Sequence, residues 1–536
     1  MVQARRSAVK SGWLRTQTDQ ILAEEQTLRQ GGGDAGQQRQ RKLGRLNARQ
    51  RVEKLCDPKS PWLELGLWAA WQMYPQAGEV PAAGVVAGIG AVHQRRCMII
   101  ANDATVKAGA FFPATAKKII RAQRIAARCN LPLIYLVDSA GVYLPMQDEV
   151  FPDEDDFGRI FRNNAVLSAM GVPQYAAIMG NCVAGGAYLP VLCDKVLMVK
   201  GSQLALAGAA LVKAALGQSV DPEELGGAQM HAQISGSVDF VEQNDQSCLQ
   251  RLRELVALLP EALPRSNDDG SRRPTSDIYS LFTSAQGAYD ARDLLAFIID
   301  RDTLLEYKAD YGKTLLCAYA RLAGRPVGIV ANQHQTARTR REGVQIGGVI
   351  YHDSADKAAR FVMDCSQSGL PLLFFQDVQG FMVGRDSEQA GVIRSGAKLV
   401  NAVSNAAVPK ITVIVGGSFG AGNYALCGKA FDPHFIFAWP GARYAVMGAE
   451  QASDTLLSLA TRQAERDGIS GADLQKLHDT IKADYQKQMD IRYGAARGWV
   501  DAIIAPHTTR DVLIESLELA TRPPPPGGFR GGILQV

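Results

Sequence analysis

Short apolar runs alternate along this chain with longer amphipathic, partly basic stretches. Residues 115–130 have the spacing of a helix and lead into residues 131–138 (LPLIYLVD), which are apolar almost throughout. A run of this length that is not interrupted by polar positions is typical of a strand buried on both faces. Because such strands recur between helical stretches, the pattern predicts an α/β fold.

The same pattern occurs twice. Four blocks of the first half return in the same order in the second half, displaced by about 230 to 240 residues. The matching pairs are residues 98–106 with 327–333, 131–141 with 370–380, 171–189 with 407–425, and 205–209 with 445–449. The order and spacing predict two duplicated domains.

A change in residue composition marks the expected boundary between the two domains. Proline, glycine and polar residues replace the apolar runs shortly after residue 260, as is typical of a linker. We therefore expect an N-terminal domain at residues 1–262, a linker at 263–275 and a C-terminal domain at 276–536.

Each half contains a glycine-rich turn between a predicted strand and a predicted helix. The turns are residues 181–188 (NCVAGGAY) and 418–424 (SFGAGNY), and the repeat aligns Gly185 and Gly186 with Ala421 and Gly422. The start of a helix has free N–H groups, and small residues let an anionic oxygen approach them. One such turn is usually a packing feature, but two at matching positions predict two sites that stabilise an oxyanion.

Composition narrows the functional classes. The 536 residues have a formal net charge of +4 and no basic stripe with interleaved aromatic residues, which disfavours nucleic acid as a partner. The nine cysteines are scattered singly and favour a reducing compartment. No zinc-protease, serine-hydrolase, phosphate-loop or dinucleotide motif is present, and the histidines lack metal-ligand spacing, so we expect no metal. Two oxyanion sites without an obvious nucleophile fit enolate chemistry in which a cofactor carries the difficult step.

The amino terminus bears on localisation. Residues 1–20 are basic and are compatible with a transit peptide, but a solvated helix on a cytoplasmic protein is the more ordinary interpretation. No apolar run approaches the length of about 20 residues that spans a bilayer. We expect a cytoplasmic protein, or one of the mitochondrial matrix if the terminus is a transit peptide.

Several motifs resemble one family, the carboxyltransferase subunits of biotin-dependent acyl-CoA carboxylases, in the branch of methylcrotonyl-CoA and geranyl-CoA carboxylase. The resemblance covers about residues 38–505. The motifs that carry it are residues 38–66 (QRQRKLGRLNARQRVEKLCDPKSPWLELG), 102–123 (NDATVKAGAFFPATAKKIIRAQ), 136–161 (LVDSAGVYLPMQDEVFPDEDDFGRIF), 180–190 (GNCVAGGAYLP), 377–384 (DVQGFMVG), 416–433 (GGSFGAGNYALCGKAFDP) and 439–448 (WPGARYAVMG). It implies a tandem pair of crotonase-like domains.

The resemblance also implies a mechanism. Carboxylated biotin on a partner subunit donates the carboxyl group to an acyl-CoA, and two enolate oxygens need stabilisation. Gly185 and Gly186 would hold the thioester oxygen, and Ala421 and Gly422 the ureido oxygen of biotin. Further residues expected at the acyl-CoA are Gly141, Ala184, Tyr188 and Ala205, and those expected at biotin are Gly380, Phe381, Phe419, Gly420, Asn423 and Tyr424. The cations Lys117, Lys118 and Arg121 are candidates for the CoA phosphates, although basic residues on an exposed helix face are the more common explanation.

The partners follow from the same resemblance. The chain has neither the biotin-accepting sequence A-M-K-M nor the ATP-binding glycine loop of biotin carboxylases, so both are expected on a separate alpha subunit. Family members usually form hexamers of this chain, with the active site between the N-domain of one subunit and the C-domain of another.

Two departures from the branch bear on the substrate. Ala205 stands where methylcrotonyl-type enzymes have a large aromatic residue, which predicts a wider acyl pocket and a longer branched chain such as geranyl-CoA; repacking of the core is the ordinary alternative. Residues 333–342 (QHQTARTRRE) form a basic loop. It fits a carboxylated acyl group such as glutaconyl-CoA, but such runs are more often a solvated surface.

Three other functions remain open at this point. A glutaconyl-CoA decarboxylase of the sodium-pump type shares the fold and runs the transfer backwards. A crotonase-type hydratase or isomerase would use paired carboxylates, for which Glu149 and Asp153 are candidates, but the duplication disfavours it. A scaffold subunit without activity is disfavoured by the intact glycine turns in both halves.

Overall fold

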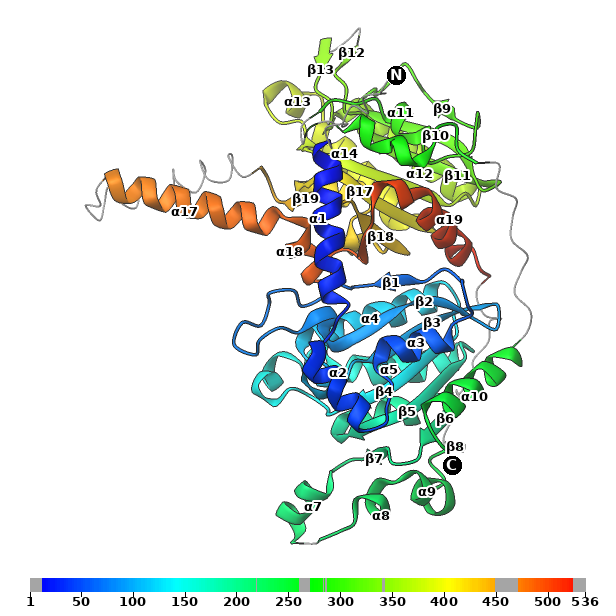
Figure 1. Ribbon diagram of the computed structural model, residues 1–536. Coiled ribbons are helices and arrows are strands. Elements are labelled where there is room, and N and C mark those ends of the chain that lie inside the picture. Colours follow the sequence, from blue (N-terminus) through cyan, green and yellow to red (C-terminus); the bar gives the residue numbers. More distant parts are fainter. Residues whose placement is uncertain are drawn as a thin grey trace, which may run out of the picture. The chain divides into compact units, whose positions relative to one another are not determined.

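The computed structural model describes residues 12–217, 219–259, 270–282, 284, 287–339, 343–448 and 471–523 (Figure 1). They form two compact units. The described part of unit 1 lies within residues 12–24, 265–494 and 503–517, and that of unit 2 within 25–264, 495–502 and 518–523. Most of the expected linker at residues 263–275 lies outside the described residues, which resume at residue 270. Each unit also takes short segments from the opposite half of the sequence, which the sequence did not predict.

Unit 2 contains an eight-stranded mixed sheet in the order β1-β2-β3-β4-β5-β6-β8, with β7 paired to β5. β1, β2 and β3 are antiparallel neighbours, and the pairs from β3 onward are parallel. Its strands are β1 (Leu63–Leu65), β2 (Val85–Val92), β3 (Arg95–Asn102), β4 (Leu133–Ser139), β5 (Gln174–Val183), β6 (Lys195–Val199), β7 (Gln203–Ala205) and β8 (Phe240–Glu242).

Unit 1 contains a second eight-stranded sheet, in the order β20-β18-β17-β15-β11-β10-β9, with β19 paired to β17. The antiparallel pairs are again at one side, between β9, β10 and β11, and the pairs from β11 through β18 are parallel. Its strands are β9 (Leu305–Tyr307), β10 (Leu315–Leu322), β11 (Arg325–Asn332), β15 (Leu372–Val378), β17 (Lys410–Phe419), β18 (Phe435–Ala438), β19 (Arg443–Ala445) and β20 (Ala502–Ile503). The shared order confirms the duplication that the sequence predicted.

The apolar runs form the central strands, as expected. Every residue of β4 and β15 is buried. In unit 2, alternate strand residues pack against helices α3 (Ala48–Leu55) and α10 (Asp245–Ala257). Helices α4 (Pro113–Arg128) and α5 (Phe157–Ala169) contact each other outside that cluster. Since successive strand residues point to opposite faces, helices cover both sides of the sheet.

Unit 1 repeats this arrangement with helices α12 (His352–Gln367) and α14 (Val392–Asn405), which contact each other and contribute to one buried cluster with the strands. The repeat extends to the helix starts. Phe112 precedes α4 and Tyr351 precedes α12, and in each case the hydroxyl three residues later accepts their backbone N–H. The other elements that lie wholly or mostly in unit 1 are α11 (Ala291–Leu295), α13 (Arg385–Gln389), α15 (Gly420–Ala425), α17 (Gly471–Met489), α18 (Ile491–Ala496), α19 (Thr509–Ala520), η6 (Thr275–Leu281), η7 (Lys429–Phe431) and η8 (Pro506–Thr508).

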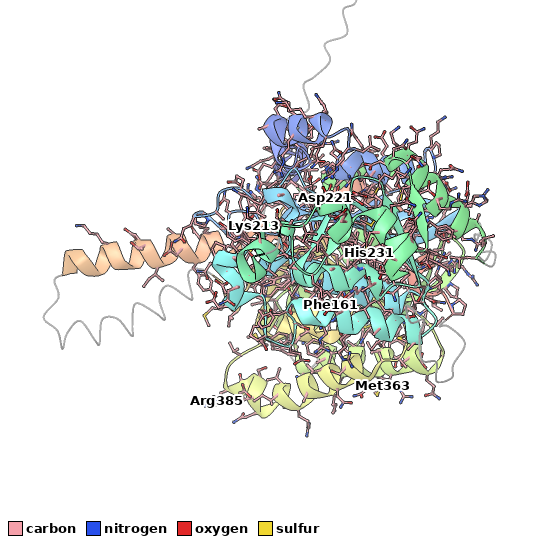
Figure 2. All side chains as sticks on the ribbon, turned by 90° about the horizontal axis from the view of Figure 1, so that it is seen from below. Phe161, Lys213, Asp221, His231, Met363 and Arg385 are labelled. Atoms are coloured by element: carbon pink, nitrogen blue, oxygen red, sulfur yellow. The ribbon has the colours of Figure 1, made fainter. Side chains whose placement is uncertain are left out.

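Between β7 and β8, unit 2 has an arm of short helices. They are α7 (Ala209–Leu216), α8 (Pro222–Gly226), α9 (Ala228–Met230) and the π-helix η5 (His231–Ser235), and Lys213, Asp221 and His231 mark them in Figure 2. The arm is tied to β7 because His231 Nε2 lies 2.7 Å from the Leu204 carbonyl oxygen. Other short elements of unit 2 are α2 (Gly33–Lys42), α6 (Tyr188–Val191), η1 (Pro81–Gly84), η2 (Lys107–Gly109), η3 (Leu144–Glu149) and η4 (Ala184–Ala187).

The amino-terminal helix predicted from the basic stretch is present as α1 (Trp13–Leu28). It is not simply solvated, because Leu14, Thr18 and Ile21 on one side are buried. Trp13 packs so closely in unit 1 that a Cβ on Gly441 would lie 2.4 Å from its ring.

The basic loop becomes a small hairpin. β12 (Ala337–Thr339) pairs with β13 (Gly343–Gln345), and Arg338 is exposed, while residues 340–342 lie outside the described residues. A second short pair joins β14 (Val349–Ile350) to β16 (Gly380–Phe381).

The nine cysteines are all unpaired, and all except the half-buried Cys56 are buried. Within the described ranges, no helix is both long and apolar enough to cross a bilayer. The same ranges contain no group of histidine, cysteine and carboxylate side chains that is placed to hold a metal ion.

Candidate active site

The first predicted turn follows β5 in unit 2. β5 ends at Val183, and the helical residues Ala184–Ala187 begin directly after it. Ala184 has a left-handed backbone with φ +59°, which turns the chain sharply out of the strand. Gly185 and Gly186 therefore occupy the first turn of the helical segment, where backbone N–H groups have no partner within the helix.

The second predicted turn follows β17 in unit 1. Phe419 ends the strand, Gly420 has φ +53°, and Ala421 and Gly422 take the same positions in α15 as the two glycines of the first turn. The backbone is thus bent at the same residue of the repeat in both units. A side chain at Gly422 is excluded because its Cβ would lie 2.5 Å from Val378 Cγ2.

A buried aspartate lies under each turn. Asp138 in β4 accepts the Asn181 N–H at 3.2 Å, and Asp377 in β15 accepts the Gly417 N–H at 2.7 Å. Both carboxylates sit where the strand pairing shifts register, between Val137 and Ser139 and between Gln376 and Val378. Each carboxylate therefore holds the strand that leads into a turn.

The side chains that face this aspartate differ between the units. Arg51, which is 1% exposed, donates to Asp138 at 3.1 Å and to Asp245 at 2.9 Å. In unit 1 the corresponding carboxylate faces His334 Nε2 at 3.5 Å and accepts the Tyr289 hydroxyl at 3.1 Å.

The His334 ring stacks on Tyr289 with centroids 5.3 Å apart. Burial raises the pKa of Asp377, and His334 partly opposes this rise. These residues were not among those predicted from the sequence, although the aspartate is shared by the repeated blocks LVDSAG and QDVQG.

The predicted acyl-CoA residues gather around the first turn. Gly141 has φ +89°, and a Cβ there would lie 3.3 Å from the Val183 carbonyl oxygen. Tyr188 follows the turn and is about half exposed. Ala205 in β7 pairs with Val183 beside the turn, and a Cβ on Gly226 would lie 3.1 Å from the Ala205 Cβ.

The three predicted phosphate-binding cations on α4 have different surroundings. Lys118 is buried, and its ammonium donates to the carbonyl oxygens of Ala82 and Val85. Arg121 donates to both carboxylate oxygens of Asp501, at 2.8 and 2.7 Å. These internal contacts disfavour a phosphate role for both residues, because a buried or paired cation is not presented to a ligand. Lys117 is exposed and retains the prediction.

The predicted biotin residues lie on or beside the second turn. Tyr424 is exposed, whereas Asn423 Nδ2 donates to Ser418 Oγ at 2.8 Å and so helps to hold the turn itself. Gly380 and Phe381 form β16, and Phe381 packs under α14, where a Cβ on Gly396 would lie 3.1 Å from its ring.

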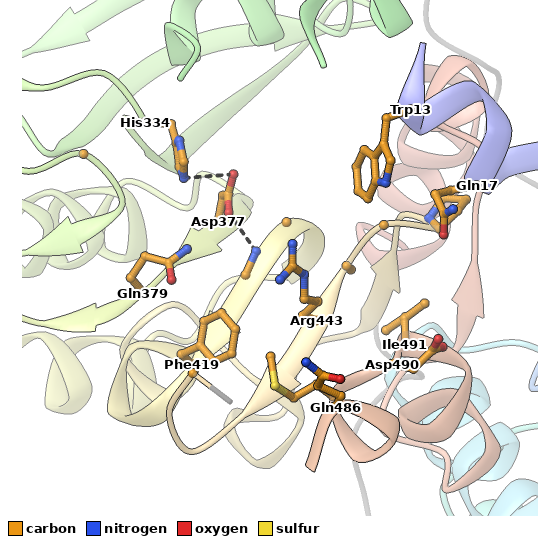
Figure 3. A pocket seen from close by; sticks show the side chains of 18 residues that line it. Trp13, Gln17, His334, Asp377, Gln379, Phe419, Arg443, Gln486, Asp490 and Ile491 are labelled. Atoms are coloured by element: carbon orange, nitrogen blue, oxygen red, sulfur yellow. Dashed lines mark hydrogen bonds and ion pairs between the residues drawn. The ribbon is translucent and has the colours of Figure 1, made fainter. Parts of the chain in front are cut away.

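A cavity of about 700 Å³ adjoins the second turn in unit 1 (Figure 3). Phe419, the last residue of β17, lines it, as do the Asp377–His334 pair and Arg443 of β19. Its size is in the range of small-molecule sites. Arg443 was not among the residues predicted from the sequence, and the repeat carries no signal for it because Gln203 occupies the corresponding strand position in unit 2.

The carboxylates proposed for a hydratase, Glu149 and Asp153, are both exposed, and Asp153 lies in the loop after η3. Among the described contacts they form no pair with each other, and neither lies under the turn in the way that Asp138 does.

Comparison with known proteins agrees with this geometry. The model of the carboxyl transferase domain matches residues 39–525. The chain is 43% identical over 502 residues to the biotin-dependent 3-methylcrotonyl-coenzyme A carboxylase beta1 subunit of Mycobacterium tuberculosis, covering 92% of each chain. It is 42% identical over 526 residues to the mitochondrial methylcrotonoyl-CoA carboxylase beta chain of Arabidopsis thaliana, covering 95% of this chain and 86% of that one.

A solved structure is also similar over the whole length. The geranyl-CoA carboxylase beta subunit of P. aeruginosa matches with a TM-score of 0.86 and 33% identity, covering 99% of both chains. Together with the paired sheets and paired turns, these similarities confirm the family and the tandem crotonase-like fold inferred from the sequence, and they replace the hydratase and scaffold alternatives. The chain therefore belongs to the carboxyl transferase family, as the carboxyltransferase subunit of a biotin-dependent acyl-CoA carboxylase.

Proposed function

We propose that this subunit carboxylates the γ-carbon of a β-methyl-branched enoyl-CoA, with the acyl thioester at the turn of unit 2 and biotin at the turn of unit 1. The observation that carries the proposal is the pair of turns. Both have a left-handed residue before two small helical residues, and both are held by a buried aspartate. The relatives described above are named as carboxylases of methylcrotonyl-CoA and of geranyl-CoA.

At the turn of unit 2, the N–H groups of Gly185 and Gly186 would donate to the thioester oxygen. Loss of the γ-proton of a β-methyl enoyl-CoA places negative charge on this same oxygen through conjugation. The same two N–H groups would therefore stabilise the enolate that forms during γ-carboxylation. One donor in such a hole contributes about 3–4 kcal/mol to lowering the barrier.

The residues of unit 1 fit a cyclic urea. Ala421 and Gly422 offer N–H groups to its oxygen, and the cavity beside Phe419 has room for the ring. When bound, carboxylated biotin supplies the carboxyl group that the acyl-CoA receives. Gly380 and Phe381, Gly420, Asn423 and Tyr424 would shape this turn, and the biotin itself would arrive on an alpha subunit.

The assembly and location are part of the same proposal. A beta subunit of this family requires a partner that carries biotin and the ATP-dependent carboxylation step. We infer a hexamer of this chain within that complex, in the cytoplasm. Size-exclusion chromatography with light scattering on the complex would give the copy number, and a dimer or monomer would contradict the hexamer.

The deciding experiment is ATP-dependent fixation of labelled bicarbonate by the complex isolated from its host through a tag on this chain. The panel is acetyl-, propionyl-, 3-methylcrotonyl- and geranyl-CoA. We expect incorporation with the branched enoyl-CoAs and a biotinylated partner in the complex. Absence of incorporation from all four, together with decarboxylation of glutaconyl-CoA, would support the reverse-running alternative.

Chain-length preference is argued from Ala205, which lies beside the first turn and opposite Val183. A small side chain here leaves room for a longer acyl chain, so we propose geranyl-CoA over 3-methylcrotonyl-CoA. Ala205→Phe should lower kcat/KM for geranyl-CoA by at least tenfold more than for 3-methylcrotonyl-CoA. Ala445→Phe, at the same position of the repeat in β19, is the matched control. Equal losses for both substrates would show that Ala205 only fills the core.

A further inference from the structure

The cavity of unit 1 contains an arginine whose hydrogen-bond donors have no protein acceptor among the described residues. Arg443 rises from β19 into the space between Asp377 and Trp13 (Figure 3). Within the described part of the chain, its guanidinium makes no hydrogen bond or ion pair. An arginine that lines a cavity without a partner is unusual because its five donors are then left to water or to a ligand.

The acidic side chains of the cavity are already engaged. The Asp490 carboxylate binds Arg492 at 3.0 and 2.7 Å, and Arg492 also binds Glu24 at 2.7 Å. Asp377 faces His334 and accepts the Gly417 N–H and the Tyr289 hydroxyl. Arg443 acts on Asp377 only through its charge, which helps to oppose the rise in the pKa of that carboxyl. The hydrogen-bond donors of its guanidinium therefore remain available for an anion.

Neutral hydrogen-bonding groups surround this charge. The side-chain amides of Gln17, Gln379 and Gln486 line the cavity, and none of them bonds to any residue that the structure describes. Trp13 and Phe419 provide aromatic surface. One cation, three free amides and two aromatic rings form a set suited to a flat polar ring that bears a single anionic group.

We propose that this cavity binds the carboxyl group in transit, with Arg443 holding its carboxylate. The planar guanidinium matches a carboxylate through two parallel hydrogen bonds. Arg443 pairs in register with Gly417, and Ala445 pairs with Phe419, so the subsite is continuous with the strand that leads into the second turn. The inference rests on the proposed function and adds the residue that recognises the carboxylate.

The carboxylate has two sources in this reaction, the carboxylated cofactor and the carboxylated acyl-CoA. The experiment compares each with its uncarboxylated counterpart, using biocytin against carboxybiocytin, and geranyl-CoA against its carboxylated product. Dissociation constants are measured by calorimetry at alkaline pH on the complete complex. The variants are Arg443→Gln and Arg443→Lys. Arg443→Gln removes the charge, whereas Arg443→Lys keeps the charge but loses the two parallel N–H donors of the guanidinium.

Arg385→Gln is the control, because Arg385 is 86% exposed on α13 in the same unit (Figure 2). We expect Arg443→Gln to weaken the carboxylated member of one pair by at least tenfold and its neutral counterpart by less than twofold. Arg443→Lys should fall between the wild type and Arg443→Gln. Selective loss of carboxybiocytin assigns the subsite to the cofactor, and selective loss of the acyl product assigns it to the substrate side.

Two results would overturn the inference: unchanged binding of all four ligands, or equal weakening of the neutral and carboxylated members. Bicarbonate fixation and biocytin binding by the wild-type complex distinguish failure of this inference from failure of the proposed function. If the wild-type complex fixes bicarbonate while Arg443→Gln binds normally, only the carboxylate subsite is wrong. If the wild-type complex neither fixes bicarbonate nor binds biocytin, the proposed function is wrong as well.

Discussion

At the scale of single residues, the two turns owe their chemistry to what is missing from their side chains. Gly186 has no atom within 4 Å of the position where a Cβ would stand, whereas a Cβ on Gly422 would collide with Val378. A side chain at Gly186 would therefore not clash with any other part of the protein. The effect of a side chain at Gly186 on activity can therefore be tested separately from its effect on folding.

Gly186→Val should therefore leave the fold intact and remove activity. We expect kcat to fall by roughly 100- to 1000-fold, because the new side chain keeps the thioester oxygen from its donors. Gly158→Val in α5, where a Cβ also meets nothing, is the control for adding the same side chain on a helix. Thermal unfolding checks the fold, and normal turnover by Gly186→Val would remove the turn from the mechanism.

Burial of Lys118 lowers the stability of the fold by an amount that depends on pH. Burial lowers its pKa from the usual 10.5 to about 7, so between these values the unfolded chain binds a proton that the folded chain does not. Stability must then rise with pH across this window, and the cost is present in full below about pH 7. One proton is equivalent to about 1.4 kcal/mol per pH unit at most.

Lys118→Met should flatten this dependence. We expect the difference in unfolding free energy between wild type and variant to move in favour of the wild type from pH 7 to pH 9, as measured by urea denaturation. The variant loses stability at every pH, since the carbonyls of Ala82 and Val85 lose their donor, so the slope and not the offset is the readout. Parallel curves would mean that Lys118 is charged in the fold.

At the scale of elements, each turn depends on the strand before it. The register shift between β4 and β5 brings Asp138 against the backbone of β5, and this is possible because Gly180 has no side chain. A Cβ there would lie 2.0 Å from the carboxylate, and one on Gly416 would lie 2.3 Å from Asp377. The same exclusion holds in both units, so each strand requires a glycine next to the aspartate that holds it.

Gly180→Ala should displace Asp138 and disturb the turn that follows. We expect a loss of about 1–3 kcal/mol in unfolding free energy, which is typical of overpacking, together with a higher KM for the acyl-CoA. Gly208→Ala, where a Cβ meets nothing, should change neither quantity. Equal stability of the two variants would show that the strand end yields easily to a methyl group.

At the scale of the whole molecule, unit 2 is completed by a segment from far along the chain. The segment 495–502 is bound by Arg121 through Asp501, by the Gly66 N–H at 2.6 Å to the Asp501 carbonyl oxygen, and by the Ala70 N–H at 2.9 Å to the Ala496 carbonyl oxygen. The Asp501 side chain is 1% exposed. This ion pair therefore anchors the return of the chain.

Asp501→Ala should destabilise unit 2 by about 3 kcal/mol, because it removes two hydrogen bonds and an opposite charge from the guanidinium of Arg121 in a mostly buried position. Asp155→Ala is the control, because its partner Arg124 lies on the same helix as Arg121. The pair of Arg124 with Asp155 is about half exposed, and such pairs contribute less than about 1 kcal/mol. Hydrogen exchange at residues 495–502 is the measurement. Equal protection in both variants would show that the backbone contacts alone hold the segment.

The sequence by itself determined the class of fold, the duplication, the positions of both turns and the family. These follow from local patterns, because buried strands must be apolar and a sharp turn near a ligand needs small residues. The central strands and the helix at residues 115–130 were placed within a few residues of their observed bounds.

Only the tertiary structure decided which polar residues serve the site. Lys118 and Arg121 read as surface cations, yet one is buried against carbonyl oxygens and the other anchors residues 495–502. His334 lies in a basic loop by sequence but faces Asp377 in the fold, and only the fold places Arg443 in the cavity beside the second turn. The reason is physical: whether a charge is free or paired depends on partners that are distant in sequence and that no local pattern contains.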